Sequence, residues 1–248
     1  MATKKNKKSN EFKTKIKLGL IGSGGRMGHE ISKAAKDSGA FDLFLGVSRS
    51  STNKEFLHQL QTLQNENANN VDLWIDFSSP ELFDDALATA VKFKKPFVSG
   101  TTGLSDKQFK NIDKAAKKIP ILWASNMSLG VALLNEAIQL FSKISDFDFQ
   151  IEEFHHNKKK DNPSGTAKTL QQTLEISVGK QLPPIMGIRG GGIFGIHKVY
   201  AMSDQETICF EHTALNRAVF AQGAVRAGLW LYKNKPGLYK MSEVLLKS

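Results

Sequence analysis

The sequence predicts an α/β protein with two domains: an N-terminal domain built on a parallel sheet, and an α+β C-terminal domain with a mixed open sheet. Three observations support this. Short apolar strands alternate with helical stretches over residues 16–124, as in a doubly wound sheet. A glycine-rich turn joins the first strand to the first helix. Beyond a long amphipathic stretch at 129–144, strand-like segments dominate.

The first half of the chain is expected to alternate strand and helix. The expected strands are 16–21, 41–47, 71–77, 97–99 and 121–124. Helices are expected at 29–38, ending at Gly39, and after Ser78-Ser79-Pro80-Glu81, where a serine caps and a proline occupies the first turn. A further helix over 106–118 begins after Ser105.

In the second half, residues 129–144 read as one amphipathic helix. Its expected apolar face holds Leu133, Leu134, Ala137, Ile138 and Phe141. Strands are expected at 147–154, 185–189, 193–202 and 206–213, and helical segments at 217–232 and 236–246.

The turn after the first strand is a candidate dinucleotide site of Rossmann type. It reads Gly22, Ser23, Gly24, Gly25, Arg26, Met27, Gly28. Glycines let the backbone turn tightly and approach a pyrophosphate at the N-terminus of the following helix. Turn glycines alone are weak evidence, but their place between strand and helix strengthens the prediction.

The run from Glu153 to Thr166 carries the most chemical information. It sets His155 and His156 where a strand runs out into a loop, with Lys158, Lys159 and Lys160 following. Ser164 is a good N-cap, so the backbone N–H groups of Gly165 and Thr166 would face a bound anion. The run therefore predicts a site that protonates and holds an acidic small molecule. Taken singly, a lysine run is usually a solvated loop, and a histidine pair is more often structural than catalytic.

The same run resembles the signature of the dihydrodipicolinate reductases (4-hydroxy-tetrahydrodipicolinate reductases) of lysine biosynthesis. That signature is close to E-x-H-H-x-x-K-x-D-x-P-S-G-T-A, and each fixed position occurs over 153–167. The form GxGGRMG at 22–28 fits the same family. Arg189-Gly190-Gly191-Gly192 resembles its R-x-G segment, whereas Gly195-Ile196-His197-Lys198 departs from the usual G-E-H-T.

The resemblance implies a reaction and roles for particular residues. The reaction is NAD(P)H-dependent reduction of 4-hydroxy-2,3,4,5-tetrahydrodipicolinate to 2,3,4,5-tetrahydrodipicolinate with loss of water. His155 is then the general acid/base and Lys159 a second proton donor. His156, Gly165 and Thr166 hold a substrate carboxylate. Loops contacting the nicotinamide half are implied at Gly100, Thr101, Thr102 and at Ala124, Ser125, Asn126, Met127.

The end of the second strand bears on the choice of cofactor. Ser48, Arg49, Ser50 and Ser51 follow it without an acidic residue to take a ribose 2′-hydroxyl. Arg49 and the hydroxyls suit a 2′-phosphate, so NADPH is expected to be preferred and NADH remains possible. Many relatives carry an acid where Ser48 stands. Arg49 could instead be a solvated loop residue.

Domain boundaries follow in part from the resemblance. Residues 1–14 are expected to be a basic disordered tail, 15–127 with 217–248 the dinucleotide-binding domain, and 128–216 the substrate-binding and oligomerisation domain. Seven lysines against one acid in residues 1–17 supply much of the net charge of +10. No nucleic-acid motif accompanies this charge, so no specific nucleic-acid partner is expected. A homotetramer is implied by the relatives.

Composition fits a cytoplasmic enzyme. With 40% hydrophobic and 23% charged residues the chain is ordinary for a globular protein. No apolar run reaches the length of a membrane span, and the N-terminus lacks a signal peptide's apolar core. Cys209, the single cysteine, is expected to pack within a strand. No metal is expected at the histidine pair, because no acid or cysteine stands at ligand spacing and lysines are adjacent.

Two other functions stay open on the sequence. One is a sugar or aldehyde reductase of the same fold, which would leave the histidine and lysine run without a purpose. The other is a non-catalytic NADP-binding sensor, which would not need His155 and Lys159.

Overall fold

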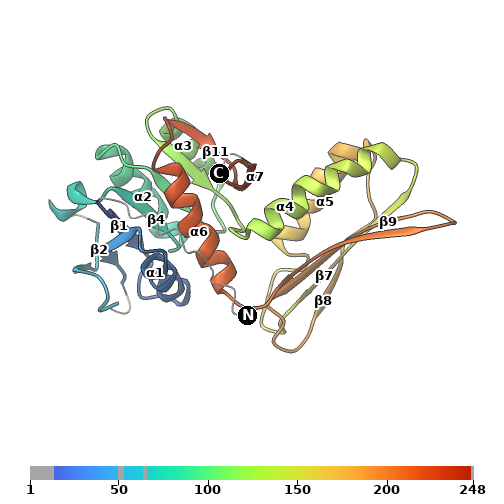
Figure 1. Ribbon diagram of the computed structural model, residues 1–248, viewed down its shortest axis with the longest axis horizontal. Coiled ribbons are helices and arrows are strands. Elements are labelled where there is room, and N and C mark those ends of the chain that lie inside the picture. Colours follow the sequence, from blue (N-terminus) through green and yellow to red (C-terminus); the bar gives the residue numbers. More distant parts are fainter. Residues whose placement is uncertain (1–13, 50–52, 64–65, 247–248) are drawn as a thin grey trace, which may run out of the picture.

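The computed structural model describes residues 14–49, 53–63 and 66–246, and it contains two sheets. Each sheet forms the core of its own lobe, and the two lobes lie side by side (Figure 1). The expected basic tail falls outside the described residues except for its last position. None of the helices in the described ranges is both long enough and apolar enough to span a bilayer.

The first sheet has seven strands in the order β11-β6-β5-β4-β1-β2-β3, and every pairing in it is parallel. This fits an apolar strand pattern, because a parallel sheet is buried on both faces. The chain order reverses beside β1, between β4 and β2, and such a switch point opens a crevice at the carboxyl ends of the strands. The strands are β1 Ile16–Ile21, β2 Phe41–Val47, β3 His58–Leu60, β4 Leu73–Asp76, β5 Phe97–Ser99, β6 Pro120–Trp123 and β11 Gly237–Tyr239.

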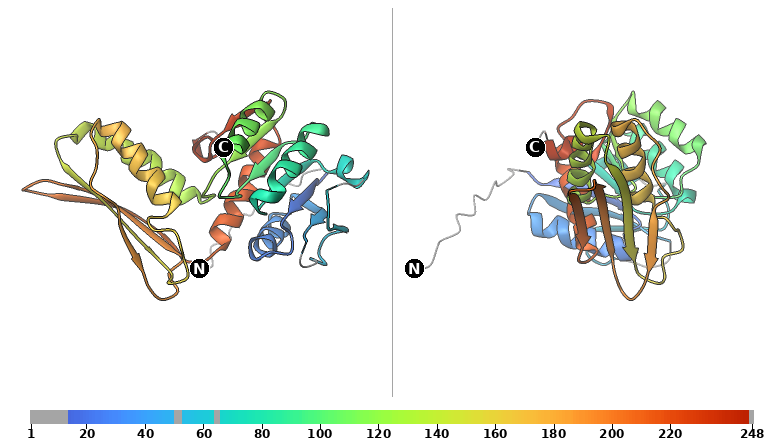
Figure 2. Two further views of the ribbon diagram at one scale, coloured as in Figure 1. Left: turned by 180° about the vertical axis from the view of Figure 1, so that it is seen from behind. Right: turned by 90° about the vertical axis from the view of Figure 1, so that its right-hand side faces the viewer.

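Helices cover both faces of this sheet. One buried cluster joins β1 to α1, α6 and α7, and another joins the opposite face to α2 and α3. The helices are α1 Arg26–Ser38, α2 Pro80–Lys92, α3 Asp106–Ala116, α6 Ala218–Leu231 and α7 Met241–Leu246. The last two come from the C-terminal end of the chain, which returns to the first lobe (Figure 2).

The second sheet has the order β10-β9-β7-β8 and is mixed, since only β7 and β8 pair in parallel. Its strands are β7 Asp148–His155, β8 Met186–Arg189, β9 Gly195–Met202 and β10 Thr207–Ala214. Helices α4 Leu129–Ala137 and α5 Gly165–Val178 and the 3-10 helix η2 Ile138–Ile144 pack on one face. The predicted fold class is confirmed.

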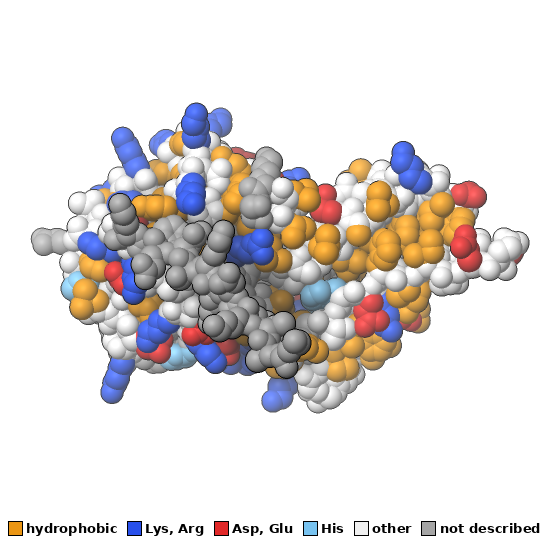
Figure 3. Space-filling model, in the orientation of Figure 1, with side chains coloured by type: hydrophobic (Ala, Val, Ile, Leu, Met, Phe, Trp, Pro, Cys, Tyr) orange, Lys and Arg blue, Asp and Glu red, His pale blue; other side chains and the backbone are white. Residues whose placement is uncertain are grey.

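Several predicted boundaries were wrong. Helix α1 begins at Arg26 rather than His29, so Arg26 and Met27 lie in its first turn. The amphipathic helix is α-helical only to Ala137, and it tightens into a 3-10 helix from Ile138. Leu133, expected on the buried face, is 56% exposed. Hydrophobic side chains accordingly gather on the surface of the second lobe over α4 (Figure 3).

The C-terminal segment also differs from the prediction. Residues expected to form one helix contain the strand β11, which pairs with β6 and extends the first sheet, before α7 begins. The short elements β3 and η1 Glu66–Asn70 were not predicted. Cys209 is exposed, since the side chains of β10 alternate and the core face takes Ile208 and Phe210 instead.

Candidate active site

The glycine-rich turn occupies the carboxyl edge of the first sheet. Gly22 has a φ of +85°, and a Cβ on it would lie 2.3 Å from the carbonyl oxygen of Phe77. A Cβ on Gly28 would lie 2.3 Å from the carbonyl oxygen of Gly22. Neither position tolerates a side chain, because the turn, the neighbouring loop and helix α1 pack backbone against backbone.

The N-terminus of α1 suits a pyrophosphate. Its N-cap residue Gly25 supplies no side-chain cap, its first turn contains no acid, and Arg26 stands at its first position. The helix therefore offers backbone N–H groups, a dipole and a cation to a bound anion. The predicted residues Gly22 to Met27 all lie at this edge, and they fit a dinucleotide.

Arg49 lies just beyond β2 and is exposed, while Ser50 and Ser51 fall outside the described residues. The structure adds a neighbour that the local sequence did not indicate. Glu81, in the first turn of α2, has its pKa lowered chiefly by a hydrogen bond from Ser79 and also by the charge of Arg49. Ser79 stands at the N-cap of α2, but its hydroxyl makes no capping bond. An acid thus lies within electrostatic range of the arginine.

A buried carboxylate holds the loops that follow β4 and β5. Asp76 accepts hydrogen bonds from the backbone N–H and hydroxyl of Ser78 and from the hydroxyls of Ser99 and Thr101, at 2.5 to 3.1 Å. The Thr101 carbonyl accepts a bond from the Trp123 indole, 2.9 Å away. Asp76 therefore fixes the start of the loop that contains Gly100, Thr101 and Thr102, and sequence reasoning missed it. An acid at the end of an otherwise apolar strand is the signal that could have found it.

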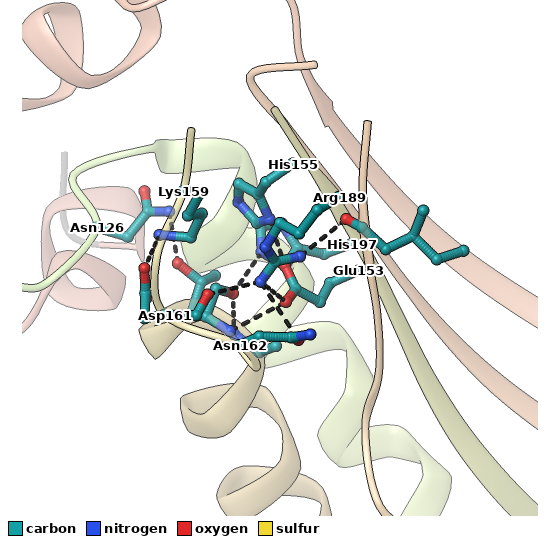
Figure 4. Close-up of polar contacts among 12 residues, drawn as sticks. Asn126, Glu153, His155, Lys159, Asp161, Asn162, Arg189 and His197 are labelled. Carbon is teal, nitrogen blue, oxygen red and sulfur yellow. Dashed lines mark hydrogen bonds and ion pairs between the residues drawn. The ribbon is translucent and has the colours of Figure 1, made fainter. Parts of the chain in front are cut away.

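The second half of the site lies at the carboxyl end of β7. Glu153 and His155 share the buried face of this strand, because alternate residues point the same way. The Glu153 carboxylate contacts Nδ1 of His155, and its other oxygen accepts hydrogen bonds from Arg189 at 2.6 Å and from the Ser164 backbone at 3.0 Å (Figure 4). One buried carboxylate thus connects β7, β8 and the start of α5.

Burial and charge act in opposite directions on this pair. Burial would raise the pKa of Glu153, but the hydrogen bonds from Arg189 and Ser164 and the charge of His155 outweigh it, so the pKa is lowered. Burial lowers the pKa of His155; the charge of Glu153 offsets this only in part, and Lys159 lowers it further. His155 is therefore neutral near pH 7 in the free protein.

The lysine expected to donate a proton is paired in this structure. Lys159 Nζ lies 2.9 Å from a carboxylate oxygen of Asp161 (Figure 4). The backbone N–H of Gly165, the first residue of α5, also helps to lower the pKa of the Asp161 carboxyl. Lys158 and Lys160 are exposed. The cation and the helix N-terminus predicted to bind an acid are thus both occupied by a side chain of the same loop.

Helix α5 begins as predicted. The hydroxyl of Ser164 accepts a hydrogen bond from the backbone of Ala167, so Gly165 and Thr166 form the first turn. Asn126 donates a hydrogen bond from Nδ2 to the Thr166 hydroxyl at 3.0 Å. This bond joins the loop after β6 to the first turn of α5, so the two halves of the predicted site meet there. His156 is half-buried, and its carbonyl oxygen accepts a bond from the Lys159 backbone.

His197 and His212 extend the polar row across the sheet. Glu153 pairs with His197 on β9, and His197 pairs with His212 on β10. The His197 ring meets the His155 ring edge to face at 5.2 Å, and its Nε2 lies 3.4 Å from the Ser164 hydroxyl. Burial chiefly lowers the pKa of His197 to about 3.

The expectation that no acid stands near the histidines was wrong. Ligand atoms of Glu153, His155 and His197 lie within 4.8 Å of one another, because strand pairing brings the third residue to the other two. However, the carboxylate already accepts bonds from Arg189 and the α5 backbone, and Lys159 adds a second positive charge. These positive charges, and the hydrogen bonds that the carboxylate already accepts, disfavour a metal cation at this position.

Comparison with known proteins matches both halves of the chain to one family. Residues 16–127 match the model "Dihydrodipicolinate reductase, N-terminus", and residues 130–245 match "Dihydrodipicolinate reductase, C-terminus". The chain is 54% identical over 231 residues to a 4-hydroxy-tetrahydrodipicolinate reductase of Bdellovibrio bacteriovorus, covering 93% of this chain and 96% of that one. A reductase of the same name from Rickettsia bellii is 38% identical, covering 91% and 93%.

A solved structure agrees in fold. The dipicolinate-bound dihydrodipicolinate reductase from a Paenisporosarcina species superposes with a TM-score of 0.79 at 19% identity, covering 94% of this chain and all of that one. The parallel sheet with its glycine-rich turn, joined to a mixed sheet that carries Glu153 and His155, defines a two-domain oxidoreductase that binds a nicotinamide dinucleotide. The chain belongs to the dihydrodipicolinate reductase family.

Proposed function

We propose that the chain reduces 4-hydroxy-2,3,4,5-tetrahydrodipicolinate to 2,3,4,5-tetrahydrodipicolinate in lysine biosynthesis, with NADPH preferred over NADH. The reaction consumes one hydride and one proton, and the substrate hydroxyl leaves as water. The observation that carries the proposal is the junction at Asn126 and Thr166, which brings a cofactor loop to the loop that holds His155 and Lys159.

The two carboxylates of the substrate are the groups that the lysines and the N-terminus of α5 are proposed to attract. Lys159 and the backbone N–H groups of Gly165 and Thr166 bind one carboxylate, with His156 beside them. Lys158 and Lys160 are exposed and add to the local positive potential. A dianionic substrate bound here also brings negative charge to His155 and raises its pKa, so that it can be protonated when the proton is needed.

The proton transfer is assigned to His155 as general acid/base, with Lys159 as a second proton donor. When bound, the nicotinamide supplies the hydride. Addition of the hydride to the substrate shifts electron density to the ring nitrogen. His155 or Lys159 then donates a proton to that nitrogen. Glu153 holds Nδ1 of His155, which leaves Nε2 as the nitrogen that exchanges the proton.

Cofactor preference is assigned to the loop after β2. Arg49 pairs with the 2′-phosphate of NADPH. Glu81 lies within electrostatic range of Arg49 and offers an acceptor for the ribose hydroxyls of NADH. NADH is therefore also accepted as a cofactor, with a lower kcat/KM than NADPH.

The outer face of the mixed sheet supports a homotetramer. It exposes Met186 and Ile188 on β8, at 53% and 43%. Apolar side chains on an uncovered sheet face favour burial against another copy.

The proposed reaction is tested by following NADPH oxidation with the product of dihydrodipicolinate synthase. Turnover is expected with that product, and not with sugars, aldehydes or no added substrate. Oxidation with a sugar or aldehyde alone would favour another reductase of this fold, and NADPH binding without turnover on any of them would favour a sensor.

A further inference from the structure

The Lys159–Asp161 pair occupies the place that the proposed function gives to a substrate carboxylate. The Asp161 carboxylate accepts a hydrogen bond from the Lys159 ammonium at 2.9 Å, and the backbone N–H of Gly165 at the start of α5 helps to lower its pKa. A carboxylate between a cation and a helix N-terminus is the arrangement expected of a bound acid. Here the chain supplies that carboxylate itself.

The Asp161 side chain is ionised. Burial would raise its pKa, but its hydrogen bond and charge interaction with Lys159 outweigh this and lower the pKa. It therefore presents a full negative charge to the same two partners as a substrate carboxylate would.

The backbone beneath this side chain is held separately. Arg189 donates a hydrogen bond to the Asp161 carbonyl oxygen at 2.7 Å, and the same guanidinium group binds Glu153 at 2.6 Å. The Asp161 side chain itself is 53% exposed. The loop can thus keep its backbone position while the side chain rotates away.

The strength of the pair suits a temporary contact. An ion pair between partly exposed side chains contributes little to stability, since water and salt screen it. A substrate with two carboxylates, held by further groups in the cleft, can displace one such carboxylate at little cost.

We propose that Asp161 is an internal surrogate for the substrate carboxylate: it occupies Lys159 and the α5 N-terminus in the free enzyme and is displaced when the dicarboxylate binds. The inference rests on the proposed function, which places a substrate carboxylate at Lys159. Asp161 keeps the Lys159 ammonium in position between turnovers, and it weakens the binding of anions that offer only one carboxylate. It acts as a specificity-determining residue and not as a catalytic one.

The test is calorimetric titration of the enzyme–NADPH complex with pyridine-2,6-dicarboxylate, a stable dicarboxylate. Asp161→Asn keeps the shape of the side chain but removes its charge. It should tighten dicarboxylate binding about two- to fivefold, the change in affinity expected when one competing exposed ion pair is lost. Binding of the monocarboxylate pyridine-2-carboxylate should tighten at least as much. Asp161→Glu retains a carboxylate and should leave both affinities close to those of the unmodified enzyme.

Two controls separate this effect from others. Asp148→Asn removes an exposed carboxylate at the far end of β7, and it changes net charge equally without touching the loop. In a Lys159→Ala background, Asp161→Asn should lose most of its effect, because the shared partner is gone. Melting temperatures of all variants establish that each is folded.

The outcomes are distinct. Unchanged or weaker dicarboxylate binding by Asp161→Asn, or equal tightening by Asp148→Asn, would overturn the surrogate role while leaving the proposed reaction intact. If Lys159→Ala binds pyridine-2,6-dicarboxylate as well as the unmodified enzyme does, Lys159 is not a substrate contact, and that part of the proposed function fails together with the inference.

Discussion

The carboxylate of Glu153 contacts Nδ1 of His155, two positions further along the same strand. Both side chains point to the buried face of β7, and Glu153 is fully buried. The contact orients the imidazole and decides which of its nitrogens is free. The predictions below begin with this pair.

Glu153→Gln should move the pH dependence of catalysis. Loss of the carboxylate removes the main influence that raises the pKa of His155, so that pKa falls. The basic limb of the kcat/KM profile should shift to lower pH, because His155 must carry a proton to donate it. Glu152→Gln, on the opposite face of the strand, is the matched control. Equal profiles for both variants would rule out a role of Glu153 in setting the acid.

His155→Ala and Lys159→Ala should each lower kcat about 10²- to 10⁴-fold, the usual worth of general acid catalysis. NADPH affinity should change little, since these residues belong to the second lobe. Steady-state kinetics and a fluorescence titration with NADPH measure the two quantities. Lys158→Ala, an exposed neighbour, should turn over nearly normally. Near-normal turnover by either main variant would remove that residue from the mechanism.

Arg49→Asp should reverse the cofactor preference, because it removes the partner of the 2′-phosphate and adds an acceptor for ribose. Glu81→Gln should lower kcat/KM for NADH more than for NADPH. Steady-state kinetics with each cofactor measure both effects. Equal kcat/KM for NADPH and NADH in the unmodified enzyme would contradict the assigned preference.

Acid should destabilise the protein through His197. Its pKa is about 3 in the folded state and near 6.5 when unfolded, so the unfolded chain binds an extra proton between these values. The contribution of His197 to the free energy of unfolding is therefore fully present above pH 6.5. As the pH falls below that value, this contribution decreases by up to about 1.4 kcal/mol per pH unit. His197→Gln should flatten the dependence of the unfolding free energy on pH between 6 and 4.5. Urea denaturation at several pH values measures it, and an unchanged slope would show that His197 is not the group responsible.

Domain closure should protect defined segments from hydrogen exchange. Hydride transfer needs the reacting atoms about 3 to 3.5 Å apart, and the two halves of the site belong to different sheets. NADPH with pyridine-2,6-dicarboxylate should protect the connections at 127–128 and 216–217 and the loop 155–166 more than NADPH alone does. Ser128, whose hydroxyl lies 3.1 Å from His212 Nε2, belongs to the first connection. Unchanged exchange with both ligands bound would mean that the site is preformed.

The sequence by itself determined the features that depend on neighbouring residues. The alternation of Phe149, Ile151, Glu153 and His155 defines the buried face of β7, and the capping serine Ser164 defines the start of α5. The glycine-rich turn likewise followed from local backbone requirements. These patterns were enough for the fold class and the family, because a strand face, a cap and a tight turn are each decided within a few residues.

Tertiary structure alone decided which charges meet. Arg189 reaches Glu153 because β8 pairs in parallel with β7, and His197 joins them because β9 pairs on the other side. The contact between Asp161 and the first turn of α5, and the approach of Glu81 to Arg49, depend on how loops fold back in space. Strand β11 is the same case: a short segment becomes a strand only because β6 offers it an unpaired edge. Spacing along the chain does not carry this information, because most of these contacts join residues distant in sequence and the others depend on how a loop folds.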